Sequence, residues 1–334
     1  MLEVSALGWT VTIGVIVALL ALDLTLGVLR PHVVGFREAA GWSIFYIAVA
    51  IAFGVVFGSI AGWDFGTEYF AGYIVEKSLS VDNLFVFVII MGTFAVPERY
   101  QQEVLTFGII IALVLRVIFI AVGAALLSAF SFMFLIFGLI LLYTAVQLFR
   151  HRDEDPSVDD NALVKAGRRF LPITDDYVEG KMITKVDGKR MFTPLFLVLL
   201  AIGGTDLLFA LDSIPAVFGV TEEAYIVFVA NAFALLGLRA LFFLVKGLLD
   251  RLVYLSTGLS IILAFIGIKL VLHWAHKDIS ESVPEVSTPV SLGVIIGILI
   301  ITTVASLIKS SKDPSLKAHP GSLRASSDQQ HADK

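Results

Sequence analysis

The chain alternates between long apolar runs and short polar links. Nine of the runs approach or exceed the length of about 20 residues that a helix needs to cross roughly 30 Å of hydrocarbon. We therefore predict an all-α polytopic membrane protein with about nine transmembrane helices. These cover residues 9–29, 42–62, 67–91, 103–127, 130–149, 192–220, 224–245, 252–274 and 289–308, with a tight turn at 63–66.

Two polar stretches interrupt this pattern. Residues 150–191 carry nine basic and nine acidic side chains, which predicts a solvated cytoplasmic loop with a hairpin turn at 186–189. The tail 311–334 is polar and is predicted to be disordered and cytoplasmic. The expected division is an N-terminal helix pair (1–66), a first three-helix repeat (67–149), the loop (150–191), a second three-helix repeat (192–275), an external loop with the last helix (276–310), and the tail.

Composition agrees with this class of protein. Of the 334 residues, 57% are hydrophobic and 16% are charged, whereas a soluble domain carries about 25% charge. The absence of cysteine excludes disulfides and thiolate metal sites. The net charge of −5 argues against nucleic acid as a partner. No basic residue precedes the first apolar run, so we interpret that run as a retained helix rather than a cleaved signal.

The basic residues predict the orientation, because cytoplasmic loops of membrane proteins carry an excess of Lys and Arg. If the N-terminus is outside, the external loops hold only Lys277 and every other basic link is internal. We therefore predict an external N-terminus and a cytoplasmic C-terminus. The lipid bilayer is then the surrounding partner, and the sequence leaves a homo-oligomer open.

Two short stretches inside the apolar runs share one pattern of acidic residues. Glu76 and Asp82 stand six residues apart in the first, and Asp206 and Asp212 in the second. Each carboxylate at the bilayer centre costs roughly 2.5–3.5 kcal/mol, so four cost about 10–14 kcal/mol. A cost of that size indicates a functional site. The competing interpretation is a set of structural ion pairs with nearby basic residues.

The likeness between the two halves extends beyond the acids. Residues 113–119, LVLRVIF, are similar to residues 236–242, LGLRALF, and a weaker match joins Gln147-Leu148 to Lys269-Leu270. The third to fifth predicted helices thus form one repeat and the sixth to eighth form another. Because three is odd, the repeats enter the membrane in opposite directions. This inverted plan, with a site at the midplane, is typical of secondary transporters.

The two acids of a pair do not share a face of a straight helix, because six residues turn it through about 240°. Two explanations stay open. The helix is broken between the acids, which Pro215 favours because it cannot donate to the carbonyl of Leu211. Alternatively, Asp82 and Asp212 face each other across the interface between the repeats.

The polar residues of the two stretches offer hard oxygen ligands, which suit Mg²⁺, Ca²⁺ or Mn²⁺ rather than copper or zinc. Repulsion between close carboxylates favours protons as the exchanged ion. The predicted metal ligands are Glu76, Asp82, Asp206 and Asp212. Residues predicted to support the metal and proton path are Asn83, Ser80, Ser213, Lys77 and the carbonyl of Leu211, and those predicted to balance charge are Arg116 and Arg239.

The segment GYIVEKSLSVDN at 72–83, together with DLLFALDSIP at 206–215, resembles the TerC/Alx family of integral membrane proteins. The resemblance covers about residues 40–310. It implies manganese export, with Mn²⁺ as the transported substrate rather than a fixed cofactor, and it implies that the four paired acids form the metal site. The family name refers to tellurium resistance. We expect the protein in a bacterial plasma (inner) membrane.

The leading hypothesis is a secondary transporter, not an enzyme, that exports Mn²⁺ through the acidic site in exchange for protons. The alternative is a membrane scaffold that organises tellurium- or metal-stress partners through residues 150–191 without transport of its own. An intramembrane aspartyl protease is disfavoured, because Gly203-Gly204-Thr205-Asp206 lacks the expected Gly-x-Gly-Asp order. A tellurite carrier fits poorly, because an oxyanion would meet four carboxylates.

Overall fold

Long helices make up most of the computed structural model, which describes residues 2, 4–28, 34–151, 162–174, 176–178, 181–186, 189–245 and 252–312. A small β-hairpin accompanies them. The elements in chain order are α1 (Ala6–Val28), α2 (Phe36–Ala61), α3 (Trp63–Thr93), α4 (Glu98–Ala129), α5 (Met133–Arg150), α6 (Ala162–Phe170), β1 (Ile183–Val186), β2 (Lys189–Phe192), α7 (Pro194–Phe218), α8 (Ala224–Leu235), α9 (Leu238–Val245), α10 (Leu255–Asp278) and α11 (Thr288–Lys312).

Within the described ranges, seven helices are long and apolar enough to cross a membrane, and the bent pair of α8 and α9 raises the number to eight. The seven are α1, α2, α4, α5, α7, α10 and α11. Helix α3 is not among them, because its 31 residues include five charged side chains. The chain is therefore an all-α polytopic membrane protein, as its apolar pattern predicts.

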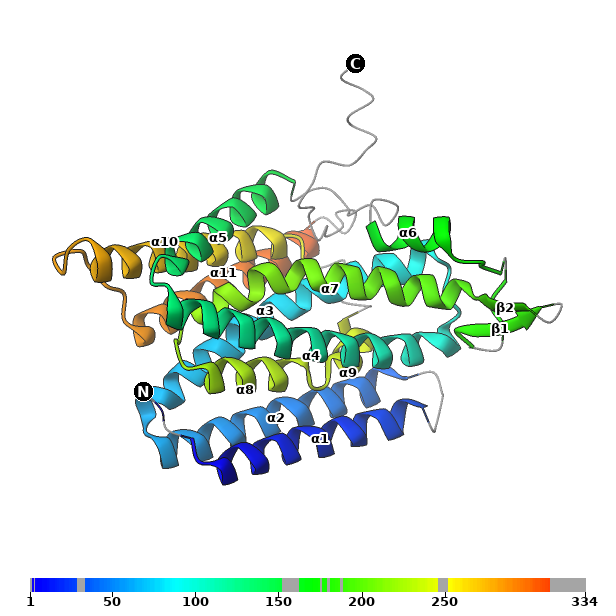
Figure 1. Ribbon diagram of the computed structural model, residues 1–334, viewed down its shortest axis with the longest axis horizontal. Coiled ribbons are helices and arrows are strands. Elements are labelled where there is room, and N and C mark those ends of the chain that lie inside the picture. The colour runs from blue at the N-terminus through cyan, green and yellow to red at the C-terminus, as the bar shows by residue number, and fades with distance from the viewer. Residues whose placement is uncertain are drawn as a thin grey trace, which may run out of the picture.

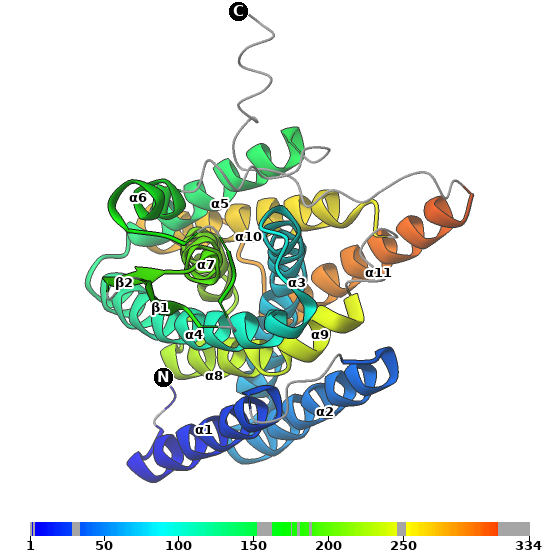
Figure 2. The ribbon, with the colours of Figure 1, turned by 90° about the vertical axis from the view of Figure 1, so that its right-hand side faces the viewer.

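The helices pack in an ordered series across the molecule (Figure 1). The pair α1 and α2 lies along one edge, and α5, α10 and α11 lie along the opposite edge. Between them run α3, α4, α7, α8 and α9, which Figure 2 shows from the end that carries α6 and the hairpin. The charged helix α3 therefore lies in the interior, where neighbouring helices cover it.

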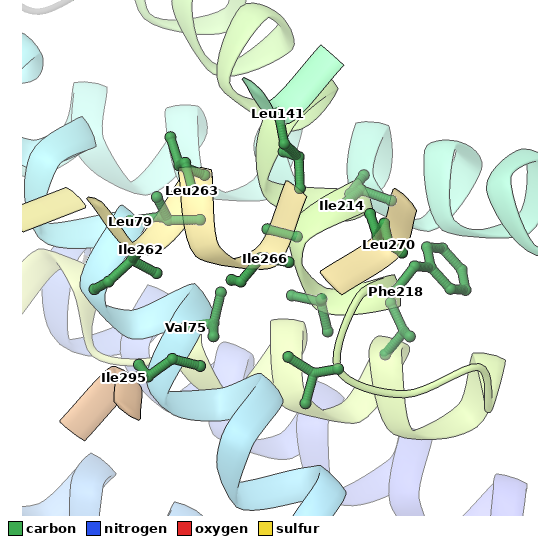
Figure 3. Close-up of a cluster of buried hydrophobic side chains, with 14 of the residues drawn as sticks. Val75, Leu79, Leu141, Ile214, Phe218, Ile262, Leu263, Ile266, Leu270 and Ile295 are labelled. Carbon is green, nitrogen blue, oxygen red and sulfur yellow. The ribbon is translucent and has the colours of Figure 1, made fainter. Parts of the chain in front are cut away.

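The apolar core explains how α3 is held there. Val75 and Leu79 on α3 belong to a buried cluster with α5, α7, α10 and α11 (Figure 3). Leu84 joins a second cluster with α4 and α7, and Tyr69 joins a third with α2 and α8. One helix thus contributes to all three clusters, so its polar residues are enclosed by apolar side chains.

The predicted turn at 63–66 is wrong, because α3 begins at Trp63. The change of direction takes place at the single residue Gly62, whose φ of 107° lies in the region that favours glycine. Directly after it, the two helices touch: a Cβ at Gly66 would lie 2.9 Å from Cα of Gly58. A one-residue link therefore replaces the four-residue turn.

Of the two explanations left open for the spacing of the acids, a break in the helix favoured by Pro215 is wrong, because α7 continues from Pro194 through Pro215 to Phe218. Proline removes one backbone hydrogen bond, and here it lies close to the end of the helix, where buried neighbours such as Ile214 and Val217 hold the last turn in place. The break lies instead in the next span. Between α8 and α9 the axis bends by 43° at Leu236 and Gly237, and Gly237 has a φ of 75°.

The segment between α5 and α7 has more structure than a simple loop. The predicted hairpin is confirmed, since β1 and β2 pair antiparallel with Val186 opposite Lys189, while the two residues between them lie outside the described residues. Helix α6 was not predicted; it packs on α7, where a Cβ at Gly167 would lie 2.9 Å from Cδ2 of Leu197. The Tyr177 hydroxyl donates to the carbonyl of Phe94 at 2.6 Å. These contacts attach the segment to the ends of α3 and α7. The predicted disordered tail lies outside the described residues, apart from its first two positions.

Candidate functional site

A buried arginine joins acidic residues from two other helices. Arg116 lies near the middle of α4, Glu76 near the middle of α3 and Asp206 near the middle of α7. The Arg116 guanidinium forms an ion pair with Glu76 through Nη1, and its Nη2 donates to Oδ1 of Asp206 at 3.3 Å. Glu76 and Arg116 are 0% exposed and Asp206 is 2% exposed. Three charges thus meet deep inside the protein.

Close helix packing brings these residues together. Helix α4 approaches α7 at Gly108, where a Cβ would lie 2.9 Å from Cγ2 of Ile202. Helix α3 approaches α7 and α8 at Gly72, where a Cβ would lie 3.2 Å from Val217 and 3.3 Å from Ala230. Glycine therefore lets three helices come near enough for one guanidinium to reach two carboxylates.

A fourth helix contributes Asn231, which sequence reasoning missed. Its Oδ1 accepts a hydrogen bond from Arg116 Nη1 at 3.4 Å, and the residue is 1% exposed. A neutral amide adds little to the free energy of inserting a helix into the membrane, so it does not indicate a functional site as a carboxylate does. The signal available in the sequence is one polar residue inside the apolar run of α8.

Several buried polar atoms around this cluster have no hydrogen-bond partner among the residues that the structure describes. Oxygen atoms in this group are Glu76 Oε2, Asp206 Oδ2, Ser80 Oγ and Ser213 Oγ, and nitrogen atoms are Arg116 Nε and Asn231 Nδ2. Buried polar groups are normally paired, so each such atom needs an explanation. The unpaired oxygens are hard donors, and a divalent cation or ordered water would satisfy them.

The remaining predicted ligands are placed less completely. Asp212 on α7 is buried, at 8% exposure, whereas the side chain of Leu211 beside it is 49% exposed. Because α7 is not broken, Asp206 and Ser213 share one face and Asp212 points about 120° away from it. The side chain of Asp82 lies outside the described part of the structure, and Asn83 is buried.

A complete metal-binding group is not formed by the described side chains alone. Among them, no three histidine or acidic residues stand close enough together to hold a metal ion. This search does not include the carboxylate of Asp82. The described site therefore consists of two acids, Glu76 and Asp206, which share an ion pair with Arg116, and of neutral polar atoms beside them.

Lys77 contacts the end of α8, beside the break between α8 and α9. Its ammonium group donates to the carbonyl of Ala234 at 3.0 Å. Ala234 is the second-last residue of α8, where backbone carbonyls lack helical partners and the helix dipole is negative. Lys77 therefore caps α8, and it connects the helix that carries Glu76 to the break.

Arg239, the second arginine expected to balance the acids, has a different partner. Its Nη2 donates to Oδ1 of Asp23 on α1 at 3.1 Å, and its Nη1 lies 3.4 Å from Oε1 of Gln102. The Tyr46 hydroxyl also donates to Asp23, at 3.2 Å. Asp23 is 6% exposed. The structure thus forms a second buried charge pair that the sequence interpretation did not anticipate.

A third polar group links the ends of α7, α10 and α11. Nε2 of His273 lies 2.9 Å from Glu222, and Nδ1 lies 2.5 Å from Glu285. The hydrogen bond from His273 holds the pKa of Glu222 below its usual range. Glu222 is half-exposed, so solvent screens the pair. This group is at the rim, far along the helices from the buried acids.

Apolar spanning helices with charged side chains at their midpoints define a polytopic integral membrane protein with an intramembrane polar site. Residues 61–314 match the Integral membrane protein TerC family. The chain belongs to this family, as the acidic motifs predict.

Relatives agree with the assignment. An uncharacterized membrane protein of Mycobacterium tuberculosis is 48% identical over 90% of this chain and 79% of its own length. The thylakoid membrane protein TERC of Arabidopsis thaliana is 42% identical over 80% of this chain and 68% of its own. A putative membrane-bound redox modulator, Alx, of Salmonella typhi is 36% identical over 91% and 95%. No solved structure matches the chain.

Proposed function

We propose that the protein is a secondary transporter that exports a divalent metal cation, Mn²⁺ first among the candidates, in exchange for protons. The observation that carries the proposal is the buried pair of Glu76 and Asp206, with carboxylate oxygens that have no partner among the described residues. Buried charge without a complete set of partners costs stability, so a cation that binds these carboxylate oxygens during transport explains why the acids are there. The protein is not proposed to be an enzyme.

The ligand chemistry supports a hard cation as substrate. Carboxylates and hydroxyls are preferred by Mn²⁺, Mg²⁺ and Ca²⁺. Asp82 and Asp212 are proposed to complete the metal site, with Ser80, Asn83, Ser213 and the Leu211 carbonyl lining the path. Protons would neutralise the carboxylates that the departing metal leaves behind. The resemblance of the acidic motifs to the TerC/Alx family favours manganese over the other two metals in this proposal.

We also propose nine spans and an inverted repeat that relates α3–α5 to the set α7–α10. The charged helix α3 would be the ninth span, since other helices surround it. The packing of α5 on α10 supports the repeat. A Cβ at Gly138 would lie 2.9 Å from the carbonyl oxygen of Gly267, and the reverse contact is equally short. Such a mutual glycine contact is what a two-fold relation between two equivalent helices would produce.

The proposed location is a bacterial plasma membrane, with the N-terminus outside. Helix α6 and the hairpin lie together at the end of the bundle where α7 begins (Figure 1). Basic residues gather at this end, among them the exposed Lys185 and Arg190 of the hairpin. Their positive charge supports a cytoplasmic position for this end.

Metal flux through proteoliposomes tests the proposal. Proteoliposomes that contain wild type or Asp212→Asn would be loaded with Mn²⁺, and metal efflux and internal pH would be followed together. Asp212 has no ion pair among the described residues, so this variant is expected to fold. We expect efflux to fall by at least about 100-fold, as the loss of one charged ligand removes roughly 3 kcal/mol. The matched control is Asp64→Asn, which makes the same substitution at an exposed position in the first turn of α3.

The outcomes separate the hypotheses. Metal movement by wild type and by Asp64→Asn, with loss in Asp212→Asn, supports the acidic transport site. A proton flux opposite to the metal supports exchange. If wild type moves no Mn²⁺, or if Asp212→Asn transports as well as wild type, the transport proposal is wrong for this site. The scaffold hypothesis, acting through residues 150–191, then takes its place.

A further inference from the structure

We propose that Arg116 is a tethered cation that occupies the place of the metal between Glu76 and Asp206 when the cargo has left. The inference rests on the proposed transport function. It adds a step that transport by exchange requires, which is the neutralisation of the empty carrier before it reorients.

The position of Arg116 is the first argument. One guanidinium nitrogen pairs with Glu76 and the other donates to Asp206. These are two of the carboxylates that would bind the cargo. A divalent cation and the guanidinium cannot both lie between them, so metal binding requires Arg116 to withdraw. The two cations therefore compete for one site.

The second argument is that, among the described contacts, Arg116 is held closely by Glu76 alone, whereas its contacts with Asp206 and Asn231 are long. The distance from Arg116 to Asp206 is 3.3 Å and that to Asn231 is 3.4 Å, whereas charge-assisted bonds are commonly about 2.7–2.9 Å. Arg116 Nε, Asp206 Oδ2 and Asn231 Nδ2 have no hydrogen-bond partner among the described residues. An arginine with a purely structural role would be better satisfied, because unpaired buried groups are costly.

Electrostatics gives the third argument. Two bare carboxylates in a low-dielectric interior repel each other and lose their hydration, so an empty carrier that retains both charges is strongly disfavoured. Arginine keeps its charge at all physiological pH values. Arg116 therefore supplies a positive charge that does not depend on pH, while protons neutralise the other carboxylates of the site.

Arg239 provides an internal comparison. It occupies the corresponding position in the motif shared by residues 113–119 and 236–242, yet it pairs with Asp23 of α1. Its contacts include none of the four predicted metal ligands among the described side chains. Among the described contacts, Arg116 is therefore the arginine that suits the proposed role, and the Asp23 and Arg239 pair offers a matched control.

Two transport modes distinguish this role from a structural one. Proteoliposomes loaded with Mn²⁺ would be measured for net efflux into metal-free medium and for exchange against external Mn²⁺, both at neutral pH. Only net efflux requires the empty carrier to reorient. In Arg116→Gln we expect exchange within about threefold of wild type and net efflux reduced by at least about tenfold. The KM for exchange should decrease, because the competing cation is gone.

Arg116→Lys gives a graded second variant. A single compact ammonium does not span Glu76 and Asp206 as the two guanidinium nitrogens do, so we expect an intermediate loss of net efflux with exchange retained. The double variant Asp23→Asn/Arg239→Gln removes the other buried pair and should keep the wild-type ratio of efflux to exchange.

The ratio of the two rates is insensitive to partial misfolding, because fewer active molecules lower both rates equally. The proposal is overturned if Arg116→Gln keeps the wild-type ratio. If that variant does not fold, a wild-type ratio in Arg116→Lys overturns it equally. Absence of both modes in wild type would instead count against the transport function itself.

Discussion

At the scale of single residues, the charges inside the membrane were the most predictable feature. Glu76, Asp206 and Arg116 stand out in the sequence because burying a charge is expensive, and the structure brings them together. Asn231 was missed because a neutral amide carries no such signal. Asp23 was not singled out because it lies late in the first apolar run and outside the repeated acidic pattern, yet its carboxylate accepts a hydrogen bond from Arg239.

The Asp23 and Arg239 pair allows a test of buried charge at this scale. Asp23→Asn leaves Arg239 buried without its carboxylate, which should lower the free energy of unfolding by about 3–5 kcal/mol. The double variant Asp23→Asn/Arg239→Gln removes both charges and should recover most of that loss. Thermal unfolding in detergent, followed by circular dichroism, measures both. A double variant no more stable than the single one would contradict this account.

At the scale of elements, apolar length predicted where helices lie but not where they break. Residues 224–245 form one apolar run, so the run itself conceals the division into α8 and α9. Gly237 is the residue in the sequence that marks the break, but Pro215 received more weight. Pro215 does not interrupt α7, because it lies close to the end of that helix. Helix α6 was missed although its nine residues place apolar and basic side chains on opposite faces, because the many charges around it indicated a solvated loop.

The break itself can be tested by replacing Gly237 with alanine. A Cβ there would lie 2.6 Å from Cδ2 of Tyr46, and the φ of 75° disfavours a side chain. We expect Gly237→Ala to lower the free energy of unfolding by about 1–3 kcal/mol.

Gly14→Ala in α1 is the control, because nothing lies within 4 Å of a Cβ at that position. It should be neutral or stabilising by up to about 1 kcal/mol, since alanine favours the helix. Equal melting temperatures for the two variants would show that the backbone at Gly237 is not constrained as described.

At the scale of the whole molecule, the arrangement depends on where helices can approach closely. The junction of α5 with α10 has glycine on both sides, Gly138 and Gly267. Each is a glycine within its own apolar run, and nothing in that pattern predicts that the two meet. Which helices pack together depends on the surfaces of both helices. Small residues allow two helices to approach closely, but they do not indicate which helix will be the neighbour.

Gly138→Leu should separate these helices. A Cβ at Gly138 would already lie 2.8 Å from a methyl group of Val271 and 2.9 Å from the Gly267 carbonyl oxygen. Overpacking of this kind commonly costs about 1–3 kcal/mol, and we expect a loss of stability in that range from thermal unfolding. Gly297→Leu on α11, where nothing lies within 4 Å, should change stability by less than about 0.5 kcal/mol. Similar losses in both would indicate a general effect of leucine.

The charge pair between α1 and α9 also ties the N-terminal helices to the rest of the bundle. The part of the chain that matches the family begins at residue 61, the last residue of α2. Arg239 lies within the matching part, but the carboxylate that neutralises it, Asp23, lies outside it, on α1. Removal of the first two helices would leave that guanidinium without its carboxylate, so we expect the matching part by itself to be less stable than the full chain.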